Sequence, residues 1–373
     1  MQALQRWTQY TVMHLDRRVA SIRSDGTCTV YAPAFMPWNL VLKQAADMNA
    51  RVNNLNNFYY WCASRVLTLD RKYAKEILNS IGMKQAATDR ERAEIALSYH
   101  CVTLTDVYWV RGYRERLGYD EISLYDHSLS DAFVDVSLRG RALTAQNAEL
   151  LPVRDAAGDV STQGAAPKAW IRREGQFLLL KDGDAGHVEA ELTASRVARC
   201  FDVPQVLYEP WEYEGQQVSV SRLMTSRERS IVPMEHAEIW AANHGTDIYS
   251  LARRIDLRGY CMMNIIDYLV GNTDRHWGNW GFLMDNRTNE PISLFPLMDF
   301  NQAFQSYDTL EGTRCLTVPG SVSQLDAARD AVRQVGLNQT AEIRREWFHD
   351  PARWAMFQNR LNVLRTQEIH PQK

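Results

Sequence analysis

The chain of 373 residues has only six cysteines, which lie far apart and form no C-x-x-C pair. Scattered single thiols argue against a disulfide framework or a zinc site and are typical of the reducing cytoplasm. The first residues, MQALQRWTQY, lack the apolar segment of a signal peptide. The longest apolar stretch, CMMNIIDYLVG, is too short to cross a bilayer and contains Asp267. We therefore expect a soluble, cytoplasmic protein without a membrane partner.

The sequence also lacks a strong charge of either sign, since its formal net charge is −3. Without a general positive field, direct binding of nucleic acid is not expected. Internal repeats, low-complexity tracts and heptad runs are absent as well. Apolar residues make up 45% and charged residues 23%, which is the balance of a globular protein with a sizeable core.

The composition changes near residue 150, and this change predicts the domain organisation. Residues 1–150 look mixed, with helical character strongest between Leu55 and Tyr108, and carry no clear chemistry. We expect this accessory region to recognise substrate, to hold a partner protein, or to brace the rest of the chain. The stretch at 143–167 gathers Pro, Gly, Asp and Ser and marks a boundary. The predicted domains are 1–150, 151–228 and 229–373.

Residues 151–228 are predicted to be rich in strands, with one helix over EAELTASRVARCF. The expected strands are Lys168–Arg172, Gln176–Leu180, Gln205–Tyr208 and Gln217–Leu223. Beyond His236 the pattern turns helical, strongly so from Leu251 to Val270, and a hairpin follows around the turn at 285–290. The tail from Ser323 is helical in pattern. This order predicts an α+β fold with a small sheet-rich lobe, a larger helical lobe and a ligand cleft between them.

The densest polar cluster is NTDRHWGN at 272–279, directly after the apolar helix. Asp274 and Asn279 lie five residues apart, and Asp299 follows Asn279 by twenty residues at the end of the predicted hairpin. Phosphoryl transfer needs a carboxylate that orients and deprotonates the attacking hydroxyl, and oxygen ligands that hold Mg²⁺ across the phosphates. Asp274 suits the first role, and Asn279 with Asp299 suits the second.

Alone, this cluster is weak support for a kinase. An Asp-x4-Asn pair occurs by chance about once in a chain of this size. An Asp-Arg-His turn is also a common surface salt-bridge loop. The cluster gains weight only from the residues upstream.

Upstream, a loop of small residues, STQGAAPK at 161–168, leads into a predicted strand, and its amides could approach phosphate closely. Lys181 ends the next strand, where a lysine is either solvated or a point charge on the phosphates. A carboxylate from the following helix would hold such a lysine, and both Glu189 and Glu191 open that helix. Two glutamates at a helix N-terminus also need no ligand to be stable there.

The ordered series resembles the HipA-like kinase family, in its bacterial and phage-type members. The resemblance is carried by STQGAAPKAW at 161–170, by Lys181, by ELTASR at 191–196, and by LTDVYWV at 104–110, and it spans about 100–305. The element DRHWGN at 274–279 also resembles the catalytic loop of phosphoinositide kinases. The usual Gly-rich and DFG sequences of protein kinases are missing, since only Gly164 lies in the loop and Asn301 replaces the DFG glycine.

The resemblance implies an ATP-dependent Ser/Thr protein kinase with a two-lobed fold and Mg²⁺ as cofactor. Lys181 would hold phosphates and pair with Glu191, Asp274 would be the catalytic base, and Asn279 and Asp299 would be metal ligands. His276 would handle a proton or contact the γ-phosphate, or else simply pack. The residues expected around the nucleotide are Ser161, Thr162, Gly164, Lys168, Leu223 and Met224.

Four further hypotheses concern the activity. Autophosphorylation of Ser161 or Thr162 would disfavour nucleotide by charge repulsion. A lipid or small-molecule kinase is the alternative within the same chemistry, although the sequence shows no basic amphipathic helix for a membrane. A nucleotide-binding pseudokinase that acts as an interaction module, and transfer of AMP instead of phosphate, also stay open.

Overall fold

The computed structural model describes residues 9–45, 47–67, 71–80, 88–126, 137–138, 166–182, 185–304 and 309–369. The chain divides into two compact units, each with its own core. Unit 1 contains the residues up to Asp182 together with two later segments, Thr225–Ser230 and Asp285–Glu290, and unit 2 contains the rest. The division into domains 1–150, 151–228 and 229–373 stays a prediction.

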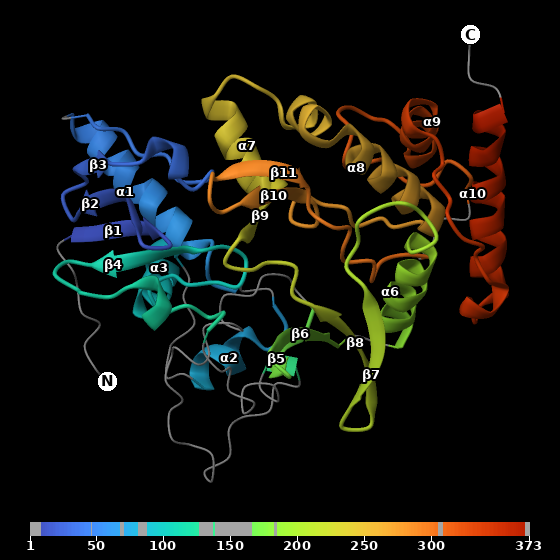
Figure 1. Cartoon of the computed structure of the whole chain (residues 1–373), viewed down its shortest axis with the longest axis horizontal. Coiled ribbons are helices and arrows are strands. Elements are labelled where there is room, and N and C mark those ends of the chain that lie inside the picture. Colours follow the sequence, from blue (N-terminus) through green and yellow to red (C-terminus); the bar gives the residue numbers. More distant parts are fainter. Residues whose placement is uncertain are drawn as a thin grey trace. The chain divides into compact units, whose positions relative to one another are not determined.

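Unit 1 is built around a four-stranded antiparallel sheet with the order β3-β2-β1-β4 (Figure 1). Its strands are β1 (Gln9–His14), β2 (Arg17–Arg23), β3 (Cys28–Val30) and β4 (Tyr108–Gly112). The central strand β1 pairs with both neighbours, so that Val12 lies opposite Val110 and Met13 opposite Trp109. All four of these side chains are fully buried. They form the sheet's contribution to the core of unit 1.

Helices α1 (Met48–Ala63), α2 (Ala74–Ser80) and α3 (Asp89–Ser98) complete this part of unit 1, with single 3₁₀ turns at Pro33–Phe35 and Tyr119–Glu121. Asp47 caps α1 by accepting the Ala50 N–H at 2.9 Å. The Phe58 ring of α1 lies 5.1 Å from the Tyr10 ring of β1. The predicted helical character between Leu55 and Tyr108 is therefore confirmed for α1 and α3, whereas the strands β1 and β2 were not predicted.

A second element of unit 1 is the hairpin of β5 (Lys168–Arg173) and β6 (Gln176–Lys181). Its two-residue turn has Glu174 and Gly175 at φ 50° and 78°, which matches the right-handed twist of the strands. The predicted hairpin is confirmed, and the register places Lys168 directly opposite Lys181.

Unit 2 begins with α6 (Ala185–Ala198) and the hairpin of β7 (Tyr208–Tyr213) and β8 (Gln216–Arg222). The prediction of a strand at Gln205–Tyr208 was wrong. Gln205 makes only an isolated bridge to Leu297, and the strand begins at Tyr208. The prediction followed the apolar residues of Gln205–Tyr208. Most of β7 is at least partly exposed, so apolar periodicity could not identify it.

Three short strands, β9 (Arg229–Pro233), β10 (Gly281–Asp285) and β11 (Glu290–Leu294), form a sheet with the order β11-β10-β9. The predicted hairpin around 285–290 is therefore confirmed. Gly281 allows β9 and β10 to meet, because a Cβ there would lie 2.1 Å from the Val232 carbonyl oxygen. Helix α7 (Met234–Asn243) follows β9 directly.

The long helix α8 (Ile248–Val270) leads into the polar cluster, as its apolar pattern predicted. It is kinked at Asp256 (φ −148°), whose carboxylate accepts the Gly259 N–H at 2.7 Å and the Leu294 N–H at 3.1 Å. The helix ends at Gly271 in the left-handed conformation that favours glycine.

The helical tail predicted from Ser323 is confirmed as α9 (Gln324–Val335) and α10 (Pro351–Ile369), with a 3₁₀ turn at Arg345–Trp347 between them. Both helices pack on α8 (Figure 1). The buried Arg360 of α10 donates to the carbonyl oxygen of Tyr268 at the end of α8, at 2.8 Å. In the described part of the chain, every helix is too short or too polar to span a bilayer.

Candidate functional site

The predicted site residues are distributed over both units. Ser161, Thr162 and Gly164 lie outside the described residues. Lys168 and Lys181 belong to unit 1. Unit 2 holds the others, namely Glu191, Leu223, Met224, Asp274, His276, Asn279 and Asp299.

Lys168 and Lys181 lie opposite each other on the β5–β6 hairpin, and each is only 6% exposed. Directly opposed residues project from the same face of a hairpin, so two ammonium groups share one surface. Lysines are almost never buried to this extent unless anionic or carbonyl groups face them. The interpretation of Lys181 as a solvated strand-end lysine is therefore wrong. The Lys168 carbonyl oxygen is held by the buried Arg71, whose Nη2 donates to it at 2.6 Å.

The loop after α8 is organised by an ion pair inside unit 2. The guanidinium of Arg275 binds the Asp267 carboxylate through two hydrogen bonds of 2.9 Å, and both residues are 5% exposed or less. Asn272 adds a third bond, from its Nδ2 to Asp267 Oδ1 at 2.9 Å. Such bidentate, buried pairing fixes geometry strongly. The interpretation of this cluster as a surface salt-bridge loop is therefore wrong.

Arg275 also ties together the two segments that carry the predicted metal ligands. Its Nη1 donates to the carbonyl oxygen of Asn279 at 2.8 Å and to that of Met298, the residue before Asp299, at 2.5 Å. Burial opposes the positive charge, but the carboxylates of Asp267 and Asp299 outweigh burial, and the pKa of Arg275 is raised above its ordinary value. One permanently charged group thus holds both segments.

Asp274 and Asn279 are fixed to each other through the backbone. The Asp274 N–H donates to Asn272 Oδ1 at 3.2 Å, and the Asp274 carbonyl oxygen accepts Asn279 Nδ2 at 3.0 Å. Because the amide nitrogen of Asn279 is used within the loop, its Oδ1 is the atom suited to a cation. The Asp274 side chain is half-buried, whereas Asn279 is buried.

Asp299 adopts a strained backbone conformation, with φ 58°. Non-glycine residues in the left-handed region cluster at functional sites, where the surroundings enforce them. Here the Asp299 N–H donates to the hydroxyl of Tyr208 at 3.1 Å, and Phe300 is fully buried next to it. The Tyr208 N–H in turn donates to Ser195 Oγ at 3.2 Å. Ser195, a residue of the ELTASR motif, therefore helps to position Asp299.

Glu191 and Glu189, which the sequence left as alternatives, have different surroundings. Glu191 is 1% exposed, and its carboxylate accepts the Ser219 hydroxyl of β8 at 2.5 Å. Glu189 instead forms an ion pair with Arg353 of α10 at 3.5 Å. Within unit 2, Glu189 is therefore engaged by α10, whereas Glu191 is buried against β8.

His276 is exposed, and its Nδ1 accepts the Gly278 N–H at 3.0 Å. In the neutral ring the proton therefore lies on Nε2. The start of α7 packs against the same loop, since the Glu235 N–H donates to the Trp277 carbonyl oxygen at 3.4 Å. Partial burial raises the pKa of the Glu235 carboxyl, while His276 opposes that shift. Glu235 is a neighbour of His276 that sequence reasoning missed, because no motif surrounds it.

Leu223 and Met224 follow β8 and are both half-exposed, as an apolar contact surface requires. Sequence reasoning missed the residues that hold the site together. Asp267 was noticed only as an interruption of the apolar run, and Arg275, Tyr208 and Ser219 were assigned no role. In the described ranges, no group of three or more His, Cys, Asp or Glu could hold a metal ion by itself. Asn279 and Asp299 carry the amide and carboxylate oxygens that Mg²⁺ prefers as ligands in proteins.

No protein-family model and no curated protein match this sequence. Solved structures that resemble the chain include one from the complex of HipA, HipB and operator DNA, a toxin–antitoxin system of Shewanella oneidensis MR-1. The two chains are 13% identical, and the match covers 96% of this chain and 97% of that one with a TM-score of 0.54. The proinflammatory kinase CtkA of Helicobacter pylori is 15% identical, with 56% of this chain and 92% of that chain covered and a TM-score of 0.43. The predicted α+β fold of the HipA-like kinase type is confirmed.

Proposed function

We propose that this protein is an ATP-dependent phosphotransferase, a HipA-like Ser/Thr protein kinase that transfers the γ-phosphate to a hydroxyl of a protein substrate. The observation that carries the proposal is the pair of hydrogen bonds that Arg275 Nη1 donates to the carbonyl oxygens of Asn279 and Met298. It supports Asn279 and Asp299 from one buried group, as a bound metal–phosphate unit would require.

Asp274 acts as the base that orients and deprotonates the acceptor hydroxyl. Its backbone is held on both sides by Asn272 and Asn279, while its carboxylate is half-buried. General-base catalysis contributes about 10²–10⁴-fold to a rate. The backbone support of Asp274 is what keeps this carboxylate in place for the attack.

Asn279 and Asp299 would hold Mg²⁺, which neutralises charge on the phosphates when it is bound. Asn279 contributes an amide oxygen and Asp299 a carboxylate whose backbone is fixed by Tyr208. Neither residue can be exchanged for its isostere without a change in charge or ligand type. Asp299→Asn therefore removes one negative ligand while leaving the shape of the side chain unchanged.

Lys181 and Lys168 would neutralise the phosphates, and Glu191 would pair with Lys181, as the sequence resemblance implies. All three side chains are buried, which is unusual for charged groups and supports this assignment. Ser161, Thr162 and Gly164 would approach the phosphates through their backbone, and Leu223 with Met224 would contact adenine. His276 would contact the γ-phosphate through its Nε2–H.

The test is transfer from ATP labelled at the γ-phosphate, by the wild type and by the Asp274→Ala and Asp299→Asn variants. A generic protein acceptor and lipid vesicles are offered in separate reactions, and intact-mass analysis distinguishes added phosphate from added AMP. We expect labelled protein only, and a loss of about 10²-fold or more in both variants. Asp330→Asn, a conservative change on the exposed side of α9, is the matched control. Label on lipid, a gain of AMP, or equal transfer by all variants would refute the proposal.

A further inference from the structure

The segment Thr225–Ser230 belongs to unit 1, although the residues on both sides of it belong to unit 2. It begins directly after Leu223 and Met224, the proposed adenine contacts. The bonds that hold it to the accessory region of unit 1 therefore bear on the nucleotide site.

The first of these bonds starts from Thr225, which is 7% exposed. Its hydroxyl donates to the carbonyl oxygen of Leu104, and the Tyr125 hydroxyl donates to the same oxygen at 3.3 Å. Leu104 lies in the LTDVYWV stretch that carries part of the family resemblance.

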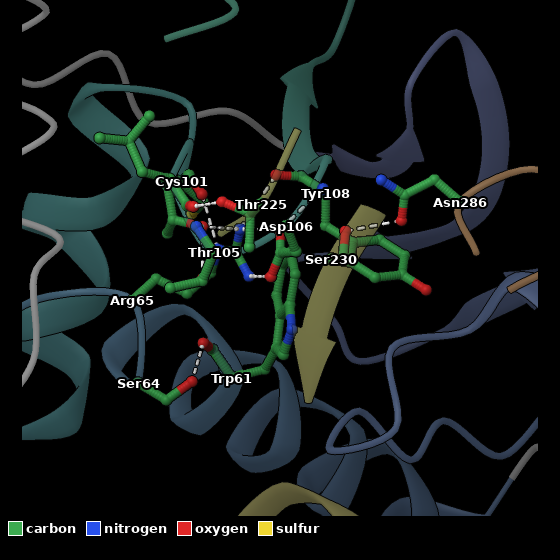
Figure 2. Close-up of polar contacts among 12 residues, drawn as sticks. Trp61, Ser64, Arg65, Cys101, Thr105, Asp106, Tyr108, Thr225, Ser230 and Asn286 are labelled. Atoms are coloured by element: carbon green, nitrogen blue, oxygen red, sulfur yellow. Dashed lines mark hydrogen bonds and ion pairs between the residues drawn. The ribbon is translucent and has the colours of Figure 1, made fainter. Parts of the chain in front are cut away.

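Arg65 anchors the loop around Leu104 (Figure 2). The Arg65 guanidinium binds both oxygens of Asp106, at 2.6 and 2.8 Å, and donates to the carbonyl oxygens of Cys101 and Tyr108 at 2.6 and 3.0 Å. Arg65 is 5% exposed, so these bonds are shielded from water. Thr225 is thus bonded to a loop with fixed geometry.

The second connection is formed by Arg227. Its guanidinium donates to Asp120 at 2.5 Å and to Asp126 at 2.7 Å, and it lies over the ring of Tyr119 at 5.3 Å. Two carboxylates and one aromatic face converge on a single side chain that is 35% exposed. Asp120 and Asp126 are 76% and 41% exposed, so each ion pair alone contributes little. The attachment comes from the convergence of three neighbours on one side chain.

The tip of the β10–β11 hairpin supports the same segment from another direction. The Asn286 N–H donates to the Glu228 carbonyl oxygen at 2.9 Å, and its Nδ2 donates to the Arg227 carbonyl oxygen at 3.0 Å. Asn286 Oδ1 accepts the Ser230 hydroxyl at 2.6 Å, a bond visible in Figure 2. The backbone of the segment is therefore fixed within unit 1.

We propose that Arg227, together with Asp120 and Asp126 of the accessory region, is a positioning residue for the adenine-binding segment. The attachment holds Thr225, and through the chain Leu223 and Met224, in the conformation that receives adenine. If loss of the attachment reduces the fraction of protein in the adenine-binding conformation to about a tenth, the apparent affinity for nucleotide falls by the same factor. The inference rests on the proposed kinase function and assigns the accessory region a direct part in it.

The experiment compares wild type, Arg227→Met and the double variant Asp120→Asn/Asp126→Asn. We expect the KM for ATP to rise about 5- to 10-fold in both variants, with kcat changed less than about twofold. Combining all three substitutions should raise KM no further, because the same attachment is already lost. Arg229→Met, an exposed arginine in the same segment, is the matched control and should leave KM unchanged.

Two inhibitors distinguish a defect confined to the adenine contacts from a defect of the whole nucleotide site. Adenosine should bind the Arg227→Met variant about 5- to 10-fold more weakly, whereas inorganic tripolyphosphate should inhibit the variant and the wild type equally. Equal weakening of both inhibitors, or no change in either, would overturn the inference. Absence of transfer by the wild type would instead count against the proposed function, so the two failures are distinguishable.

Discussion

Arg275→Met would remove the buried cation on which the candidate site depends. The substitution keeps much of the side-chain volume but deletes four hydrogen bonds, two to Asp267 and one each to the carbonyl oxygens of Asn279 and Met298. Asp267 would be left as a buried carboxylate with the Nδ2 of Asn272 beside it. Breaking a buried pair from one side costs about 3–5 kcal/mol.

For a unit of this size, each kcal/mol corresponds to about 2–4 °C in Tm, so the expected loss is about 6–20 °C. Thermal unfolding followed by circular dichroism measures this shift. Arg258→Met is the matched control, since Arg258 binds Asp202 at 2.5 Å but the two side chains are 47% and 68% exposed. An exposed pair contributes about 0–1 kcal/mol, so the control should lose less than about 4 °C.

A second variant separates charge from packing. Asp267→Leu combined with Arg275→Met removes both charges, and replacing a buried ion pair by apolar residues is often close to neutral. We therefore expect the double variant to be more stable than Arg275→Met alone, yet to lose phosphate transfer because Asn279 and Met298 are no longer held. The reasoning is refuted if Arg275→Met shifts Tm no more than Arg258→Met does.

Two further predictions concern stability. Burial lowers the pKa of His14 to about 4, so this side chain is protonated at a lower pH in the folded protein than in the unfolded chain. Folding stability that is present above pH 6.5 is therefore lost as the pH falls toward 4. Urea unfolding should show that the free energy of unfolding falls by about 2 kcal/mol between pH 7.5 and 5, and that this fall is absent in His14→Phe. An equal fall in that variant would contradict the role of His14 in the pH dependence. Arg360→Met should destabilise the protein by about 1–3 kcal/mol, because the Tyr268 carbonyl oxygen loses its charged donor and keeps only the Gly271 N–H at 3.2 Å. Arg365→Met on the exposed face should not destabilise it, and equal denaturation midpoints for the two variants would count against this role.

Elements with strong local signals were predictable from the sequence. The apolar period of α8, the two-residue turn at Glu174-Gly175 and the polar turn at 285–290 each depend on neighbouring residues only. The strand β7 was misplaced because most of its residues are at least partly exposed. The Tyr208 N–H at its start donates to Ser195 Oγ on another element, a bond that local pattern does not encode.

Motif order led to the proposed site residues, whereas the residues that hold their segments in place depend on burial. Asp274, Asn279 and Asp299 were proposed from residue type and spacing and stay predictions, but Arg275 resembled any surface arginine until its burial was known. The same holds for Arg65, whose partners lie about forty residues away in the sequence. A charged residue becomes an anchor only when distant segments surround it, and a single sequence carries no record of that.

The central claim is that Asn279 and Asp299 bind the metal that accompanies a nucleotide triphosphate. Electron paramagnetic resonance of Mn²⁺, titrated with a non-hydrolysable ATP analogue, measures this directly. The account predicts that the wild type immobilises Mn²⁺ when the analogue is present, that Asp299→Asn does so at least tenfold more weakly, and that Asp330→Asn matches the wild type. Equal retention of Mn²⁺ by Asp299→Asn and the wild type would contradict it.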